Sequence, residues 1–240
     1  MKNIISNNSF TLDTSLYISI YVQIITGIIE LLTLFKNVRP ELLIIKQLLF
    51  IDVLVQIIEL SFYIWLVYNI KTDNNITPKR YFDWFFTTPT MLITLVVYLI
   101  YLNNIEKNKL KEKNENIPKK NLELYDILLE NKENLFLIII LNSLMLLFGY
   151  LGEVNIINSN YAIILGFIPF IIYFKLIYEK YAMFSVSGYK IYFYFLIVWS
   201  FYGIAAFMPY FVKNTIYNIL DLFAKNFAGI FLSYLLLKGS

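Results

Sequence analysis

The chain has 240 residues, of which 59% are hydrophobic and 15% charged, and its mean hydropathy is +0.63. Because a soluble domain normally carries about a quarter charged residues, this many apolar side chains require lipid as their surroundings. Cysteine and histidine are absent, which excludes disulfides, Cys/His metal sites and histidine proton shuttles. We therefore expect an all-α, multi-pass integral membrane protein that forms a single domain over residues 1–240. We further expect that it is not an enzyme and binds neither metal nor nucleic acid.

Apolar segments separated by polar residues set the predicted architecture. There are seven, at 15–34, 42–67, 81–102, 135–151, 161–178, 191–211 and 216–237. Each is close to the length of about 20 residues that a membrane-spanning helix needs. Most connections are short, which favours antiparallel neighbours in an up-and-down bundle. The sequence therefore predicts a seven-transmembrane-helix bundle.

The connection at 103–134 is longer and strongly basic. It contains Lys107, Lys109, Lys111, Lys113, Lys119, Lys120 and Lys132. Basic loops stay in the cytoplasm, which predicts an N-terminus outside and a cytoplasmic C-terminus. Within this loop apolar side chains recur near helical spacing, at Leu122, Leu124, Tyr125, Leu128 and Leu129. We interpret them as a short helix on the membrane surface in preference to a partner-binding motif.

Ionisable side chains inside the apolar segments indicate function, because each costs about 2.5–3.5 kcal/mol to insert. In the last segment Asp221 and Lys225 are four residues apart and share a helix face. The third segment carries Arg80 and Asp83 at its outer end. A buried lysine can form a structural ion pair, or its desolvated amine can condense with an aldehyde to a Schiff base. Residue types alone leave both uses open.

Two sequence motifs decide between these uses. The string RYFDWFFTTP, from Arg80 to Pro89, resembles the third helix of microbial rhodopsins. Asp221-x-x-x-Lys225 resembles their retinal-attachment helix and falls in the predicted seventh span. In the sixth segment, Trp199 and Tyr202 match aromatic residues at the ring end of the retinal pocket. The resemblance covers the whole chain.

The resemblance implies a role for each matching residue. Lys225 would carry all-trans retinal as a Schiff base, with Asp83 as primary counterion and proton acceptor. Asp221 would be the second counterion, and Arg80 the extracellular gate. The implied pocket residues are Trp84, Thr87, Thr88, Trp199 and Tyr202. The sequence departs from the family at Gly203, where a proline usually follows the tyrosine, and near Ala206, which replaces a tryptophan.

The position eleven residues after Asp83 separates two kinds of transport. Proton pumps of this family usually have a carboxylate there, but this chain has Thr94. A threonine hydroxyl cannot reload a Schiff base as a tuned carboxylic acid does. The expected turn between the last two spans, YFVKNTIYN, also has no acid for proton release. Slow pumping through water stays open.

Polar stripes along the first, second and seventh segments favour a channel. They comprise Ser15, Ser19, Gln23, Thr26 and Glu30; Asp52, Gln56, Glu59 and Tyr63; and Asn218, Asn226 and Ser233. If these helices are neighbours, as in the family, the stripes form a seam that admits cations. The alternative is that they only join helices or face another subunit. The chain also resembles the viral branch of the family, in which Ser19, Asp52, Gln56, Glu59 and Asn226 occupy channel-type positions.

Our leading hypothesis from the sequence is a light-gated cation channel of the viral rhodopsin type. The alternatives are an outward proton pump, a sensory rhodopsin that docks a partner through the 103–134 loop, and a transporter without retinal. The expected partners are lipid and the translocated cations or protons. A homo-oligomer stays open.

Overall fold

The computed structural model describes residues 2–70, 72, 75–111 and 122–239, and these form helices and turns without a strand. The α-helices are α1 (Lys2–Leu34), α2 (Leu43–Asn69), α3 (Thr77–Lys111), α4 (Leu124–Glu130), α5 (Lys132–Glu153), α6 (Ser159–Ile177), α7 (Val186–Ala205), α8 (Tyr210–Asp221) and α9 (Phe227–Gly239). A 3₁₀ turn, η1 (Pro40–Leu42), precedes α2, and the π-helical segments are η2 (Tyr178–Ala182) and η3 (Leu222–Asn226).

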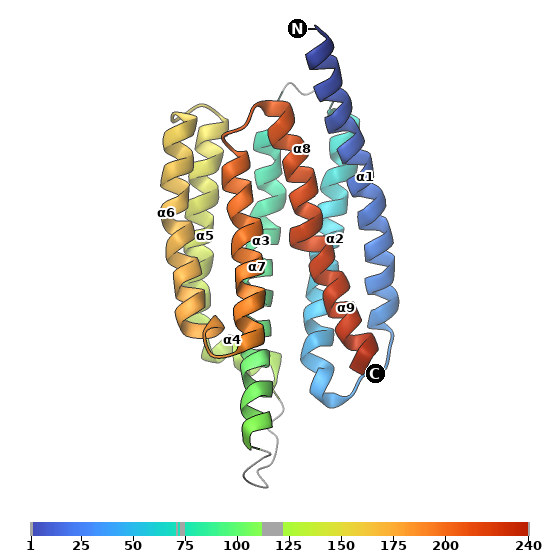
Figure 1. Cartoon of the computed structure of the whole chain (residues 1–240), viewed down its shortest axis with the longest axis vertical. Coiled ribbons are helices and arrows are strands. Elements are labelled where there is room, and N and C mark those ends of the chain that lie inside the picture. The colour runs from blue at the N-terminus through green and yellow to red at the C-terminus, as the bar shows by residue number, and fades with distance from the viewer. Residues whose placement is uncertain (1, 71, 73–74, 112–121, 240) are drawn as a thin grey trace.

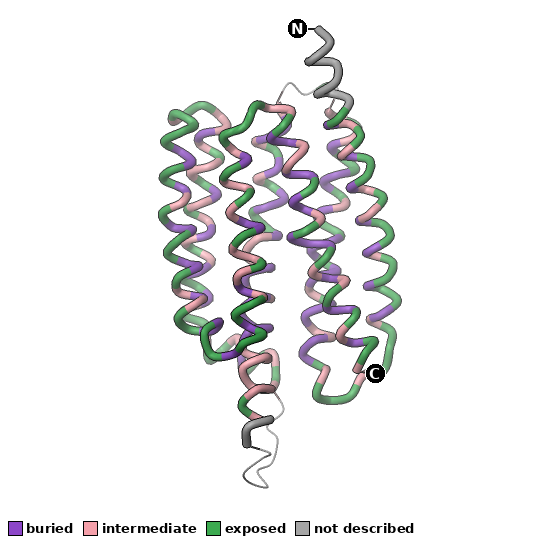
Figure 2. The backbone as a smooth tube through the Cα atoms, viewed as in Figure 1, coloured by how far each residue is buried: buried purple, intermediate pink, exposed green. Residues whose placement is uncertain are grey.

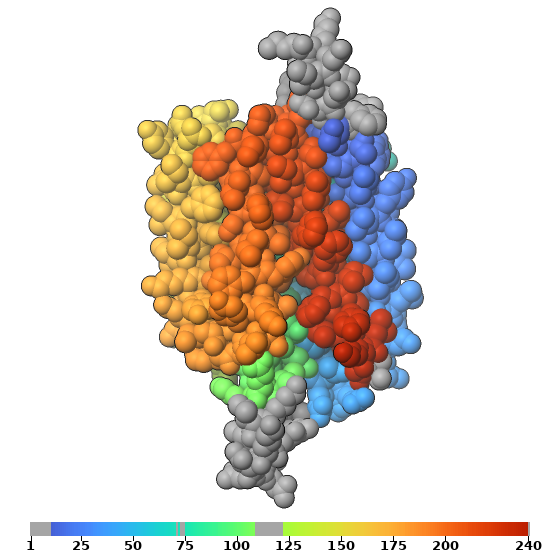
Figure 3. Space-filling view, in the orientation of Figure 1, coloured from blue at the N-terminus to red at the C-terminus, as the bar shows by residue number. Residues whose placement is uncertain are grey.

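The long helices run alongside one another as one bundle, and the chain ends at opposite ends of it (Figure 1). Helix α1 packs against α2, α8 and α9, while α5 packs most extensively against α6. Helices α8, η3 and α9 follow one another without a break and form one long bent rod (Figure 1). In the space-filling view this rod lies beside α7 on the face shown (Figure 3).

The bundle has the burial pattern of a protein in lipid. Large apolar side chains such as Tyr21, Phe82 and Ile171 are exposed, whereas many polar side chains are buried. Exposed and buried residues alternate along the long helices (Figure 2). Segments long and apolar enough to cross a membrane lie at 11–34, 77–108, 132–153, 159–182 and 210–239. In water such a surface would be unfavourable, but lipid solvates it and makes buried polar groups the costly ones.

Every predicted segment contains a helix, but the boundary between the last two was wrong. The segment 191–211 was expected to be continuous, whereas α7 ends at Ala205 and α8 begins at Tyr210. The string YFVKNTIYN is therefore helical and is not a turn. The true turn contains Phe207 and Met208, whose apolar side chains hide it from hydropathy, and Pro209 is the N-cap of α8.

The short helix expected in the basic loop is confirmed as α4. Ile127 is its buried residue, and α4 contacts α3 and α5. Its contact with a membrane surface stays a prediction. The side chains of five of the loop lysines fall outside the described residues, namely Lys109, Lys111, Lys113, Lys119 and Lys120.

Candidate functional site

The site is centred on Lys225, which lies in the π-helical segment η3 and is 1% exposed. Its Nζ donates to Asp83 Oδ2 on α3 at 2.6 Å. Two further carboxylates approach it, Asp221 Oδ1 at 3.7 Å and Glu59 Oε1 at 3.8 Å. Such π-helical turns are frequent at functional sites. Three helices thus bring acids to one buried amine.

Asp221 is the most heavily bonded of these acids. The hydroxyls of Tyr63 and Tyr202 each donate to it at 2.7 Å, one to each carboxylate oxygen. Arg80 Nη1 lies 3.6 Å from Asp221 Oδ2. Charge-assisted bonds of this kind favour the ionised carboxylate. Asp221 therefore lies between two basic side chains, Arg80 and Lys225.

Arg80 is fully buried and is fixed by α8. Its Nε donates to Asn214 Oδ1 at 2.9 Å, and its Nη2 donates to Asn218 Oδ1. Asn214 in turn donates to Thr77 Oγ1 at 2.9 Å. Because a buried guanidinium is costly without partners, these amides explain how α3 can bury an arginine next to the acids.

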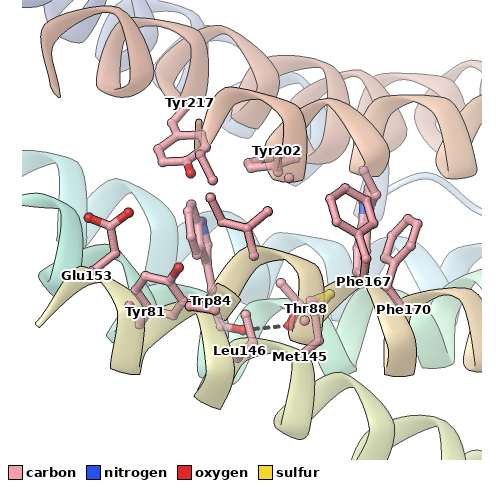
Figure 4. A pocket seen from close by; sticks show the side chains of 18 of the residues that line it. Tyr81, Trp84, Thr88, Met145, Leu146, Glu153, Phe167, Phe170, Tyr202 and Tyr217 are labelled. Atoms are coloured by element: carbon pink, nitrogen blue, oxygen red, sulfur yellow. Dashed lines mark hydrogen bonds between the residues drawn. The ribbon is translucent and has the colours of Figure 1, made fainter. Parts of the chain in front are cut away.

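A partly open cavity adjoins Lys225. Residues of α3, α5, α6, α7 and α8 line it, and Figure 4 shows Trp84, Phe167 and Phe170 among them. The indole Nε1 atoms of Trp84 and Trp199 are buried and have no hydrogen-bond partner in the described part of the chain. An elongated apolar molecule attached to Lys225 would find aromatic surfaces on several sides.

Two glycines determine the shape of this cavity. A Cβ at Gly203 would collide with the ring of Phe167, and a Cβ at Gly149 would collide with Tyr81. The absence of side chains there lets the two aromatic rings approach α7 and α5. The family departure noted at Gly203 thus corresponds to a ring packed against bare backbone.

The predicted pocket residues do not all reach the cavity. Trp84, Thr88, Trp199 and Tyr202 line it, but Thr87 does not. Thr87 Oγ1 instead donates to the backbone oxygen of Asp83 at 3.0 Å. The hydroxyl of Tyr202 was expected at the ring end, but it bonds Asp221 beside Lys225.

Of the five predicted pathway residues, Asn226 follows Lys225 in the last span, and Gln56 and Asp52 lie against this part of the span. Glu59 faces Lys225 itself. Asn226 Nδ2 donates to Gln56 Oε1 at 2.7 Å, and Gln56 Nε2 donates to Glu30 Oε1 at 2.7 Å. Asp52 and Glu59 are buried on α2. Ser19 lies elsewhere and donates to the backbone oxygen of Asn218 at 3.1 Å.

Sequence reasoning missed several members of the site. Thr94 donates only to the backbone of Thr90, as expected for a residue without a carboxylate. One acid that lines the cavity was not predicted, namely Glu153 on α5. Its Oε1 lies 2.6 Å from Lys213 Nζ. The interhelical contacts of Tyr63, Asn214 and Asn142, the last of which donates to Thr88 Oγ1 at 2.8 Å, were also not predicted. The residues next to them in the sequence gave no indication of these contacts.

A buried lysine flanked by carboxylates, at the end of an aromatic cavity in an all-helical membrane bundle, defines a protein of the rhodopsin fold. The family model described as bacteriorhodopsin-like protein matches residues 11–239. The chain therefore belongs to this family and is an integral, multi-pass membrane protein, as the sequence resemblance predicted.

Solved structures agree on the fold. Viral rhodopsin OLPVRII is similar with a TM-score of 0.74 and 24% identity, over 95% of this chain and 98% of that one. Xanthorhodopsin, described as a light-driven ion pump with dual chromophore, has a TM-score of 0.69 and 18% identity, covering 98% and 95%. Halorhodopsin, described as a light-driven chloride pump, has 0.67 and 14%, covering 95% of both chains. Curated protein sequences gave no match.

Proposed function

We propose that the chain is a light-driven ion translocator that carries all-trans retinal as a Schiff base on Lys225. The observation that carries this proposal is the placement of one buried amine between the aromatic cavity and Asp83. Retinal is an apolar rod with one aldehyde, so it needs an apolar slot that ends at an amine. The cavity beside Lys225, with aromatic side chains such as Trp84 and Trp199 in its lining, offers such a slot.

The residues around Lys225 suit the chemistry of a protonated imine. When bound, retinal supplies a light-sensitive polyene and a positive charge at Lys225 Nζ. Asp83, at 2.6 Å, is placed to accept the proton from that nitrogen. Asp221, with Arg80 and its two tyrosines as partners, keeps the site polar after the transfer. Preorganised dipoles and charges of this kind lower the cost of moving a proton.

In the membrane we assign seven spans to one domain over residues 1–240. They are α1, α2, α3, α5, α6 with η2, α7, and α8 with η3 and α9. The position of the chain ends at opposite ends of the bundle supports an odd number of spans (Figure 1). The basic loop after α3 supports an outside N-terminus and a cytoplasmic C-terminus.

The transport mode that the polar groups favour is a light-gated cation channel. Polar atoms between α1, α2 and the last span are buried without hydrogen-bond partners in the described residues, including both amide atoms of Gln23, both oxygens of Glu59, and Asn226 Oδ1. Buried polar atoms of this kind bind water when there is room. Oxygen atoms along such a seam can replace a cation's hydration shell. The neighbour OLPVRII is itself a viral rhodopsin.

One observation favours a second mode, outward proton pumping. The direct bond between Lys225 and Asp83 gives a short path for the first proton transfer. Asp83 lies on the Arg80 side of Lys225, so the proton leaves in the direction that the proposed topology calls outward. A pump would use the same residues without opening the seam.

Photocurrents recorded at several voltages separate the two modes. A channel gives a current that reverses near a cation equilibrium potential, whereas a pump current stays outward at every voltage. Glu59→Gln should change the conductance or the ion selectivity, and Glu179→Gln, on the exposed surface with its side chain 54% exposed, should not. An outward current at all voltages would reject the channel. An unchanged current in Glu59→Gln would show that the polar seam has only a structural role.

A further inference from the structure

Gly229, one turn after Lys225 in sequence, lies against two carboxyl groups. A Cβ at this glycine would collide with Glu30 Oε1 and Asp52 Oδ2. Both oxygens are therefore close to the same point on α9, and so to each other, although they come from α1 and α2. Any other residue here would push them apart.

These two acids have no cation beside them. Among the described residues, no lysine or arginine forms an ion pair with either Glu30 or Asp52, and Lys225 is already surrounded by three other acids. Glu30 Oε2 and Asp52 Oδ2 have no hydrogen-bond partner in the same part of the chain. Glu30 is 0% and Asp52 is 5% exposed. Two adjacent, buried, unpaired carboxylates would be very unfavourable.

A proton shared between the two oxygens removes the repulsion between two negative charges. We propose that Glu30 and Asp52 share one proton beside Gly229, and that this proton reloads Lys225 Nζ after Asp83 has accepted the first one. In the reloading step an O–H bond of the pair breaks and an N–H bond forms on Lys225, which leaves two carboxylates. The pair then regains a proton from water at the nearby end of the bundle. The pair thus takes the role of the carboxylate that proton pumps of this family usually have at the position of Thr94.

The polar groups between the pair and Lys225 suit this route. Glu30 accepts from Gln56, Gln56 accepts from Asn226, and Asn226 follows Lys225 directly in sequence. Amides do not carry protons themselves, but the unpartnered Asn226 Oδ1 offers an acceptor for a bridging water. Glu59, 3.8 Å from Lys225, is the other acid facing this region.

Infrared spectra of the purified protein in the dark test the shared proton without relying on transport. Glu30→Gln and Asp52→Asn should each move or remove the same carboxylic-acid carbonyl band, because one proton serves both groups. Gly229→Ala should shift that band as well. Gly27→Ala, whose Cβ would meet nothing within 4 Å, is the matched control and should leave it unchanged. A band that only one of the two acid variants affects would overturn the shared proton.

Flash spectroscopy tests the reloading role, which rests on the proposed retinal site. Return of the proton to Lys225 should be at least about tenfold slower in both acid variants, since a positioned acid contributes about 10²–10⁴ in rate. A small diffusible acid such as hydrazoic acid should restore the rate, which it could not do for a purely structural defect. Unchanged return in coloured variants would overturn the reloading role. Failure of the unsubstituted chain to colour with retinal would instead refute the proposed function and leave the infrared result intact.

Discussion

The two sides of Lys225 bury charge in opposite ways. On the side toward Arg80, two cations and the acids Asp83 and Asp221 neutralise one another through direct contacts. On the side toward Gly229, Glu30 and Asp52 approach each other with no cation paired to them among the described residues. Direct contacts fix the first side. The second side has buried polar atoms without a hydrogen-bond partner among the described residues, and these need water or a proton. A cluster of paired charges and a polar region without paired cations thus lie on opposite sides of Lys225.

The largest effect should follow from removing the amine that the two sides share. Lys225→Ala should abolish the visible band that forms on adding all-trans retinal, because no other amine lines the cavity among the described residues. Lys175→Ala is the control, since this side chain is 70% exposed and pairs with the exposed Glu179. Absorption spectra of the two purified variants give the answer. A coloured Lys225→Ala protein would refute retinal attachment at this residue.

On the Arg80 side, neutralising one acid should be strongly destabilising. Asp221→Asn leaves Arg80 buried beside a neutral amide, and breaking a buried ion pair costs about 3–5 kcal/mol. The thermal midpoint of unfolding, measured by circular dichroism in detergent, should fall accordingly. The matched control is Glu179→Gln, which breaks only an exposed pair and should cost about 0–1 kcal/mol. Equal stability of the two variants would show that Arg80 does not depend on Asp221.

The Arg80 side could be predicted from sequence, and the Gly229 side only in part. Arg80, Asp83, Asp221 and Lys225 stand in motifs with fixed spacing on two helices, so helix geometry alone brings them together once α3 and α8 are neighbours. Glu30 was visible only as one member of a polar stripe, and nothing in that stripe indicated that it meets Asp52. That meeting depends on Gly229, whose missing side chain matters only after three helices pack.

The same distinction explains the errors. Hydropathy located a helix in each of the seven predicted segments, but it could not detect the turn at Phe207, because the side chains of this turn are themselves apolar. It also gave no reason to connect Glu153 on α5 with Lys213 on α8, which are 60 residues apart in sequence. Contacts between distant helices follow from packing and not from local pattern.

On the Gly229 side, removing a neutral hydrogen-bonding group should cost less than removing a charge does on the other side. Gln56→Leu leaves Glu30 Oε1 without its donor and Asn226 Nδ2 without one of its acceptors. Asn226 Nδ2 keeps its bond to Thr26 Oγ1, so only Glu30 Oε1 is left unsatisfied, at a cost of about 1–3 kcal/mol. The same unfolding measurement should therefore place this variant between Glu179→Gln and Asp221→Asn. A loss as large as that of Asp221→Asn would mean that this side is as rigidly bonded as the Arg80 side.

The smallest effect should come from replacing an acid on the Gly229 side. Glu30→Gln keeps the shape of the side chain and an oxygen that can still accept from Gln56, and it removes an ionisable group that has no cation to lose. Because Glu30→Gln breaks no ion pair among the described residues, the unfolding free energy should change by less than about 1 kcal/mol, the size of an ordinary neutral hydrogen bond. Asp221→Asn makes the same chemical change, from carboxyl to amide, on the other side of Lys225. If both variants lost the same stability, Glu30 would have to be paired with a cation, and the contrast between the two sides would disappear.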